Sequence, residues 1–226
     1  MKLDFLNYQP QSAQHKISAM QHTHEFNLYA NPLKWKIIFE RIANGTLSPN
    51  ACNDHVMKNT LMHEAAHYPD AAIMRQLLAM GANPSAENAY GDRPMHWAVG
   101  NFHGNALHML EKCRMLPVED LAARNYKNQT PLFMFIDSYA HFTCYGSFDD
   151  YPENVKPFLR VLASMLEQCH CDPEARDNTN RTPLEDLDEN YSISECGEAV
   201  AMITAAIAAR KRWTAARATW LAACSF

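Results

Sequence analysis

The clearest apolar pattern in the chain predicts a helix with one buried face. Its apolar residues recur at helical spacing: Ile73, Met74, Leu77 and Leu78. Gly81 follows, and glycine readily takes the left-handed conformation that ends a helix. A second amphipathic stretch, Leu33 to Ala43, is followed by Gly45 in the same way. Both stretches indicate a mainly helical fold.

The two ends of the chain lack this pattern. Residues 1–31 are polar and give no clear prediction. The segment from Glu198 to Phe226 is rich in alanine and helical in composition, with Trp213 and Trp220 seven residues apart. We interpret it as a pair of capping helices. The alternative is an amphipathic helix for a membrane or a partner, although small apolar residues would insert weakly.

A short motif recurs along the chain. Thr60–Ala66 reads TLMHEAA and Arg93–Val99 reads RPMHWAV, so that His63 and His96 lie 33 residues apart. Two further copies begin at Thr130-Pro131-Leu132 and Thr182-Pro183-Leu184, 37 and 52 residues after the preceding one. Two copies are therefore in register and two follow with insertions.

This motif resembles the ankyrin repeat, whose signature T-P-L-H-x-A recurs about every 33 residues. The resemblance covers residues 57–191 and implies an all-α solenoid of stacked helix-turn-helix units with capping helices at both ends. We expect a polar segment at 1–31, a repeat domain at 32–191 and capping helices at 192–226.

The signature residues have recognisable physical roles. Proline costs nothing at a first helical position, where Pro131 and Pro183 are expected, and the threonine before each is a suitable N-cap. In the family the histidine ties neighbouring turns together, and His63 and His96 are placed to do this. The chain departs from the pattern at Phe133 and Glu185, which replace that histidine.

Most of the extra length of the third unit falls at 138–152, where several aromatic residues cluster. Long loops in repeat proteins are often functional. The segment is predicted to bind a partner or to fold back over a satellite core, and the sequence leaves both open.

The resemblance implies that a partner binds in a concave groove formed by the turns and the exposed faces of the first helices. Aromatic residues are enriched at interface hot spots, so Trp97 is predicted to bind a partner, with packing on a neighbouring helix as the alternative. Asp137, Asp186 and Glu189 predict an acidic C-terminal half of the groove. The candidate partner-binding residues are Tyr90, Asp92, Trp97, Asn101, Tyr126, Lys127, Gln129, Met134, Asp137, Tyr145 and Phe148.

Composition narrows the class of protein. The net charge of −5 does not favour a nucleic-acid partner. The seven cysteines are odd in number and scattered, as is typical of reduced thiols in a cytoplasm. No apolar run is long enough to span a bilayer, and the first 30 residues show no secretory signal, so we expect no membrane insertion.

One motif suggests an enzyme instead. Residues 63–67 read HEAAH, and in zinc peptidases two such histidines bind zinc while the glutamate activates water. However, His63 is in phase with the repeat, Glu64 and His67 fall at surface positions, and Pro69 ends the helix early. Cys169-His170-Cys171 lacks a matching second pair and is interpreted as a turn.

We therefore expect a non-enzymatic protein-interaction module, a scaffold, adaptor or inhibitor, with no cofactor and no metal. By analogy with its family, it is a candidate secreted bacterial effector that acts on a protein in the host cytoplasm. The alternative is a zinc-dependent hydrolase that uses residues 63–67.

Overall fold

The computed structural model describes residues 32–53, 55–100, 106–145, 156–190 and 196–223. Within them, helices and the turns between them make up the structure, with one isolated bridge between Cys52 and Thr60. The elements are α2 (Pro32–Ala43), α3 (Leu61–His67), α4 (Ala71–Ala79), α5 (Pro94–Val99), α6 (Ala106–Met115), the 3-10 helix η1 (Val118–Ala122), α7 (Pro131–Tyr145), α8 (Lys156–Leu166), α9 (Pro183–Asn190) and α10 (Gly197–Ala223).

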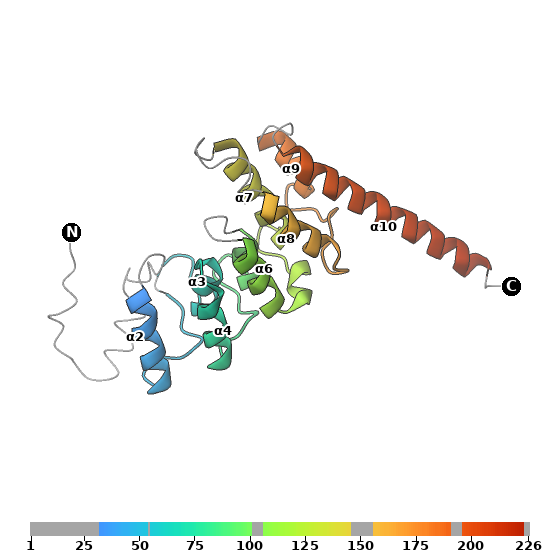
Figure 1. Cartoon of the computed structure of the whole chain (residues 1–226). Coiled ribbons are helices and arrows are strands. Elements are labelled where there is room, and N and C mark those ends of the chain that lie inside the picture. Colours follow the sequence, from blue (N-terminus) through green and yellow to red (C-terminus); the bar gives the residue numbers. More distant parts are fainter. Residues whose placement is uncertain (1–31, 54, 101–105, 146–155, 191–195, 224–226) are drawn as a thin grey trace.

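The helices stack as two parallel rows. The first helices of successive units form one row, because α3 packs against α5, α5 against α7, and α7 against α9. The second helices form the other row, because α4 packs against α6, α6 against α8, and α8 against α10. Figure 1 shows the resulting stack, from α2 at one end to α10 at the other. The prediction of an all-α repeat solenoid is confirmed.

A single apolar core runs between the two rows. Ala65, Ala66 and Ala98 are completely buried, as expected where paired helices approach closely. On α4, Met74 and Leu77 are completely buried and the remaining stripe residues are partly buried. The predicted buried face of this helix is therefore confirmed.

Local sequence sets the helix boundaries. Pro131 and Pro183 are the first residues of α7 and α9, as predicted. Gly81 follows α4 with φ of +87°, and its amide donates to the carbonyl oxygen of Leu78 at 3.0 Å. This left-handed residue ends the helix in the way that its sequence predicted.

The third unit differs from its prediction. Helix α7 continues through Tyr145, so residues 138–145 are helical and the prediction of a loop is wrong for them. The reason is packing: Tyr139 and Ala140 are buried in the core. This part of the insertion therefore packs, and the prediction for 146–152 lies outside the described residues.

The C-terminal segment forms one helix, α10, where a pair was expected. Ala199 and Ile203 are buried on its proximal half, which packs on α8, whereas every residue from 211 to 219 is exposed. In Figure 1 this distal half extends beyond the stack. None of the helices in the described ranges is long and apolar enough to cross a membrane.

Candidate functional site

Four turns precede the first helices and form one edge of the stack. We call these turns, residues 53–59, 88–92, 125–129 and 177–181, the tips. Each tip is organised by an asparagine or aspartate side chain. Oδ1 of Asn125 accepts hydrogen bonds from the amides of Lys127 and Gln129, both at 3.0 Å. Equivalent bonds are made by Asn53, Asn88 and Asp177.

Each tip also contains one residue with left-handed backbone. In the second tip this residue is Gly91, with φ of +73°. Asparagine fills the position in the next two tips, as Asn128 and Asn180, and Lys58 fills it in the first. Asparagine tolerates this conformation better than most residues, so the tips are locally well specified.

Hydrogen bonds join each tip to the next. The amide of Tyr126 donates to the carbonyl oxygen of Tyr90 at 2.9 Å. The amide of Asn178 donates to the carbonyl oxygen of Lys127, also at 2.9 Å. A side-chain bond reinforces the first link, because Nδ2 of Asn125 donates to Oδ1 of Asp92 at 2.9 Å. The tips therefore form a continuous ladder along one side of the molecule.

The two signature histidines support this ladder. Nε2 of His63 bonds to the carbonyl oxygen of Asp92 at 2.8 Å, and Nε2 of His96 bonds to that of Gln129 at 3.2 Å. Nδ1 of each ring accepts the amide at the N-cap of its own helix. Burial lowers the pKa of His63 to about 4 and also lowers that of His96, so both rings are neutral at pH 7. The predicted tie between neighbouring turns is confirmed.

The third unit lacks this histidine, and other bonds replace it. Phe133 is buried and cannot donate to the fourth tip. Instead, Nη1 of Arg124 and Nδ2 of Asn128 donate to the carbonyl oxygen of Arg176 at 2.8 and 2.9 Å. At this joint, surface side chains therefore add to the backbone hydrogen bond between Asn178 and Lys127.

The predicted partner-binding residues differ in exposure. Tyr90 is 44% exposed and Tyr126 is 68% exposed, at neighbouring tips. Lys127 and Asp137 are exposed, whereas Gln129 and Met134 are half-buried. Asn101 and Phe148 lie outside the described residues, and of Tyr145 only the backbone, at the end of α7, is described.

Asp92 does not offer its side chain to a partner. It is 9% exposed, its carboxylate accepts from Asn125, and its carbonyl oxygen accepts from His63. It therefore holds the tips together, and we leave it out of the surface proposed below.

Trp97 shows elements of both predicted roles. Its ring packs edge-on against the rings of His63 and His67, with centroid distances of 6.1 and 5.6 Å. It also contacts the core, yet remains half-exposed. The indole therefore packs on a neighbouring helix with one side and faces solvent with the rest.

Glu64 was predicted at a surface position, and this is wrong. It is 3% exposed, and its Oε1 accepts hydrogen bonds from Nδ2 of Asn53 and Asn59 at 3.0 and 2.9 Å. The first tip is longer than the others, and its two amides cover the carboxylate. Burial raises the pKa of Glu64 to about 7, opposed by these hydrogen bonds.

This geometry bears on the HEAAH motif. Both ring nitrogens of His63 are already bonded, to Thr60 and to Asp92, so neither is free to bind a metal. Within the described ranges, no three side chains among His, Cys, Asp and Glu are grouped to hold a metal ion. The repeat role of His63 accounts for its position.

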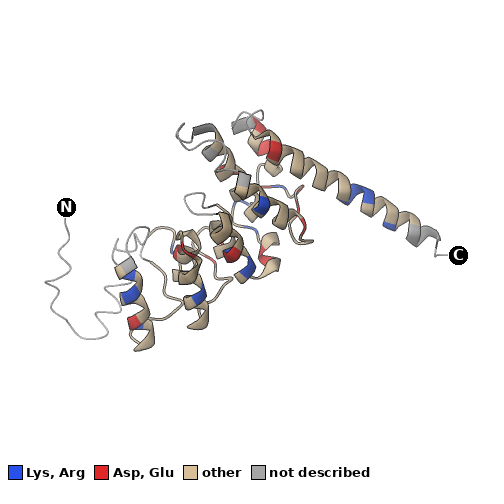
Figure 2. Ribbon diagram, viewed as in Figure 1, with Lys and Arg blue, Asp and Glu red and all other residues tan. Residues whose placement is uncertain are grey.

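The three carboxylates predicted to make the C-terminal half of the groove acidic differ in their exposure. Asp137 is exposed, but Asp186 is half-buried and ion-paired with Arg181 at 3.1 Å. The side chain of Glu189 lies outside the described residues. Figure 2 shows acidic residues on α9, and Lys and Arg on the distal half of α10.

Comparison with known proteins agrees with the repeat geometry. A family model described as Ankyrin repeat matches residues 57–89, which span the end of the first tip, α3, α4 and the beginning of the second tip. No curated protein matches the chain.

Proposed function

Because the chain is an ankyrin-repeat protein, and so a protein-interaction module, we propose that it binds its partner through the tips and the adjoining faces of the first helices. We call this the tip surface. Its members are Tyr90, Trp97, Tyr126, Lys127, Gln129, Met134 and Asp137.

One observation carries the proposal: two tyrosines are exposed on neighbouring tips that are joined by hydrogen bonds. The backbones of Tyr90 and Tyr126 are joined by a hydrogen bond of 2.9 Å, and both side chains are substantially exposed. Tyrosine supplies a large contact area with a polar tip at a low cost in side-chain entropy, and it is enriched at hot spots.

The rigidity of the ladder supports the same conclusion. Each tip is fixed by its own Asn or Asp side chain and by bonds to the next tip. A partner that binds such a surface does not have to order it first, which lowers the entropic cost of association. Trp97 adds a further aromatic ring, partly exposed, from α5, the helix that follows the second tip.

The charges of the tip surface suggest a partner that carries both acidic and basic groups. Lys127 and Asp137 are both exposed, so a complementary partner presents an acidic group to one and a basic group to the other. The central part of the contact is aromatic, and we expect most of the binding free energy to come from it.

The experiment is affinity capture from cell lysate, followed by mass spectrometry, with the wild-type chain and a Tyr90→Ala/Tyr126→Ala variant as baits. Both side chains are exposed, so the variant is expected to fold, and its thermal unfolding is measured first. A binding partner is expected to be enriched by the wild type and lost by the variant.

The matched control is Trp213→Ala. Trp213 is 64% exposed on the distal half of α10, away from the tips, so this change removes a similar aromatic area elsewhere. Retention of the partner by Trp213→Ala and loss by the tyrosine variant would support the tip surface. Retention of the partner by the tyrosine variant would contradict it.

A further inference from the structure

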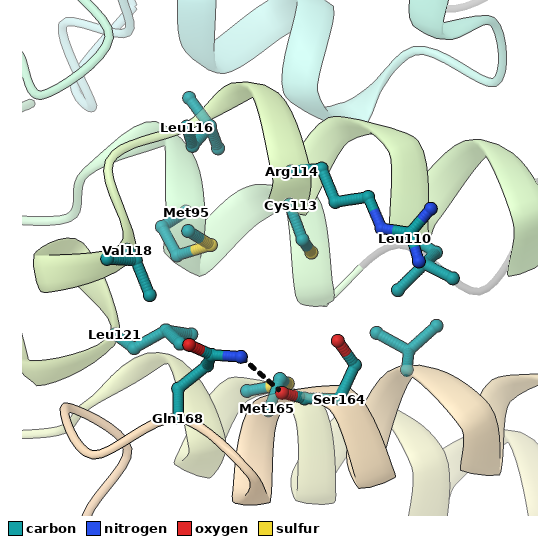
Figure 3. Close-up of a pocket in the computed structure, with 11 residues that line it drawn as sticks. Met95, Leu110, Cys113, Arg114, Leu116, Val118, Leu121, Ser164, Met165 and Gln168 are labelled. Atoms are coloured by element: carbon teal, nitrogen blue, oxygen red, sulfur yellow. Dashed lines mark hydrogen bonds between the residues drawn. The ribbon is translucent and has the colours of Figure 1, made fainter.

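A cavity of about 220 Å³ lies between two second helices of the stack. Figure 3 shows it between α6 and α8, with η1 closing one end. Most of its wall is apolar, with Leu110 from α6, Leu121 from η1 and Met165 from α8. Arg114, Ser164 and Gln168 provide its polar groups, and no Asp or Glu lines it.

The cavity arises where the repeat spacing changes. The interval from Arg93 to Thr130 is 37 residues, four more than the preceding interval. Most of the extra length lies between α5 and α6, where six residues connect the helices and three connect α3 and α4; the connection that contains η1 has fifteen residues, against fourteen between α4 and α5. Val118 and Leu121 line the cavity from this connection, so η1 forms part of its wall.

This wall is held in place by a buried carboxylate. Asp120 is 1% exposed within η1. Its Oδ1 accepts from Nη1 of Arg93 at 2.7 Å, and its Oδ2 accepts from Oγ of Ser85 at 2.7 Å. These bonds tie η1 to the preceding unit, so the cavity is preformed.

Arg114 is the charged residue among those that line the cavity. Arg114 is exposed, and within the described part of the chain no hydrogen bond or ion pair is assigned to its guanidinium. Glu111, one turn before it on α6, is ion-paired with Arg75. Beside the lining residues of α8, Arg160 lies one turn before Ser164 and Glu167 directly before Gln168, and both are exposed, so their charges oppose each other.

We propose that this cavity binds a small amphipathic anion, in which an apolar body fills the space between α6 and α8 and a carboxylate meets Arg114. A volume of 220 Å³ is below the range that drug-sized ligands occupy, so it suits a body of about ten non-hydrogen atoms. A planar guanidinium, with its fork of donors, favours a carboxylate over a neutral head group.

The site is independent of the tip surface. It is built mainly by the second helices and η1, and it contains none of the tip residues. The proposal therefore stands or fails separately from the proposed function.

The test is a titration of the isotopically labelled full chain with sodium octanoate, followed by two-dimensional NMR of its amides. Saturable shifts are expected for residues of α6, η1 and α8, with a Kd on the order of 1 mM or below, as suits a ligand of this size. Octan-1-ol, which has the same chain without the charge, is expected to bind several times more weakly.

Two variants identify the site. Arg114→Gln is expected to weaken octanoate binding about fivefold or more, whereas Arg212→Gln, the same charge change on the exposed half of α10, leaves it unchanged. Ser164→Phe is expected to fill the cavity and abolish binding. If that variant unfolds, Leu110→Phe replaces it, because Leu110 lines the opposite wall.

The proposal is overturned if octanoate causes no saturable shifts up to 10-fold above the expected Kd. It is also overturned if Arg114→Gln and Arg212→Gln bind octanoate equally, if a folded cavity-filling variant still binds it, or if octan-1-ol binds as tightly as octanoate.

Discussion

The ring of Tyr126 lies against the α-carbon of Gly91, on the preceding tip. A β-carbon added to Gly91 would stand 2.6 Å from Cδ1 of Tyr126 and 2.7 Å from its Cε1. Gly91 also has a left-handed backbone, with φ of +73°. Two features therefore require glycine at this position: its left-handed backbone and the aromatic ring of Tyr126 next to it.

Gly91→Ala is expected to lower the free energy of unfolding by about 3 kcal/mol. Left-handed backbone costs a residue with a β-carbon about 1–2 kcal/mol, and displacement of the Tyr126 ring adds to this. Gly81→Ala is the matched control, because φ there is +87° and nothing lies near its added β-carbon. Urea unfolding of both variants measures the difference.

The Tyr126→Ala background separates the two costs. In it, the cost of Gly91→Ala should fall towards that of Gly81→Ala, since the ring is gone and only the contact with the backbone nitrogen of residue 126, at 3.1 Å, remains. An equal cost for Gly91→Ala with and without Tyr126 would show that the ring contact is energetically unimportant.

Asn125→Asp is expected to destabilise the chain by about 2 kcal/mol at pH 7. The new carboxylate could still accept from Lys127 and Gln129, but it would face Oδ1 of Asp92, which Asn125 now meets as a donor at 2.9 Å. Two adjacent carboxylates repel, and the buried Asp92 would lose its donor.

Asp92→Asn in the Asn125→Asp background should restore most of the lost stability, because one donor and one acceptor again face each other. Asp177, which holds the equivalent position in the fourth tip, shows that an aspartate can organise such a turn. Chemical denaturation at pH 7 gives both values, and a double variant as unstable as Asn125→Asp would refute the pairing.

The repeats themselves could be predicted from the sequence because their signals are local. The prolines at helix starts, the alanines between helices and the glycine after α4 each act within a few residues, and all behave as expected. The tips have a local signal of their own in the sequence. Asn88, Asn125 and Asp177 recur at the same intervals of 37 and 52 residues as the signature motif. They organise the tips.

The burial of Glu64 could not be predicted in the same way, because it depends on a contact between segments. The position normally faces the groove, but here the longer first tip places Asn53 and Asn59 over the carboxylate. Likewise, the cavity between α6 and α8 depends on how α6, η1 and α8 pack together, which no local pattern in the sequence determines.

Glu64→Gln is expected to change how stability depends on pH. The pKa of Glu64 is raised from 4.5 to about 7 by burial, so between these values the folded state binds the proton and the unfolded state does not. Stability from this group therefore falls as pH rises from 4.5 to 7. The buried His63, with its pKa lowered from 6.5 to about 4, acts in the opposite direction over pH 4 to 6.5.

The two groups offset each other in the wild type, and Glu64→Gln removes one of them. Between pH 4.5 and 6.5, the free energy of unfolding of this variant should rise more steeply with pH than that of the wild type, by about 1.4 kcal/mol per pH unit. Urea unfolding across this range measures it. Glu198→Gln, an exposed change on α10, should follow the wild type. Equal slopes for Glu64→Gln and the wild type would show that Glu64 is ionised normally in the folded protein.

Lys112→Met is expected to lower the free energy of unfolding by about 2 kcal/mol. Lys112 is 2% exposed, and its Nζ donates to the carbonyl oxygens of Ala66, at 2.9 Å, and Tyr68. These carbonyls lie at the C-terminal end of α3, where a cation is favoured and unbonded acceptors are costly. Methionine keeps the apolar stem and loses the donor. Lys211→Met, which removes an exposed lysine paired with Glu174, should cost less than about 1 kcal/mol.

The pH dependence of the same variant tests whether the buried amine is charged. Burial lowers the pKa of Lys112 from 10.5 to about 8, so above pH 8 the unfolded state binds more protons than the folded state. The free energy of unfolding contributed by this group therefore rises with pH from 8 to 10.5. Measurements between pH 8 and 9 are preferred, because Cys113, whose pKa burial raises from 9 to about 12, acts in the opposite direction above that range. Over this interval the wild type should gain stability relative to Lys112→Met. Parallel curves for the two proteins would mean that the buried amine keeps the proton affinity of an exposed lysine, with the carbonyls of α3 compensating for its lost hydration.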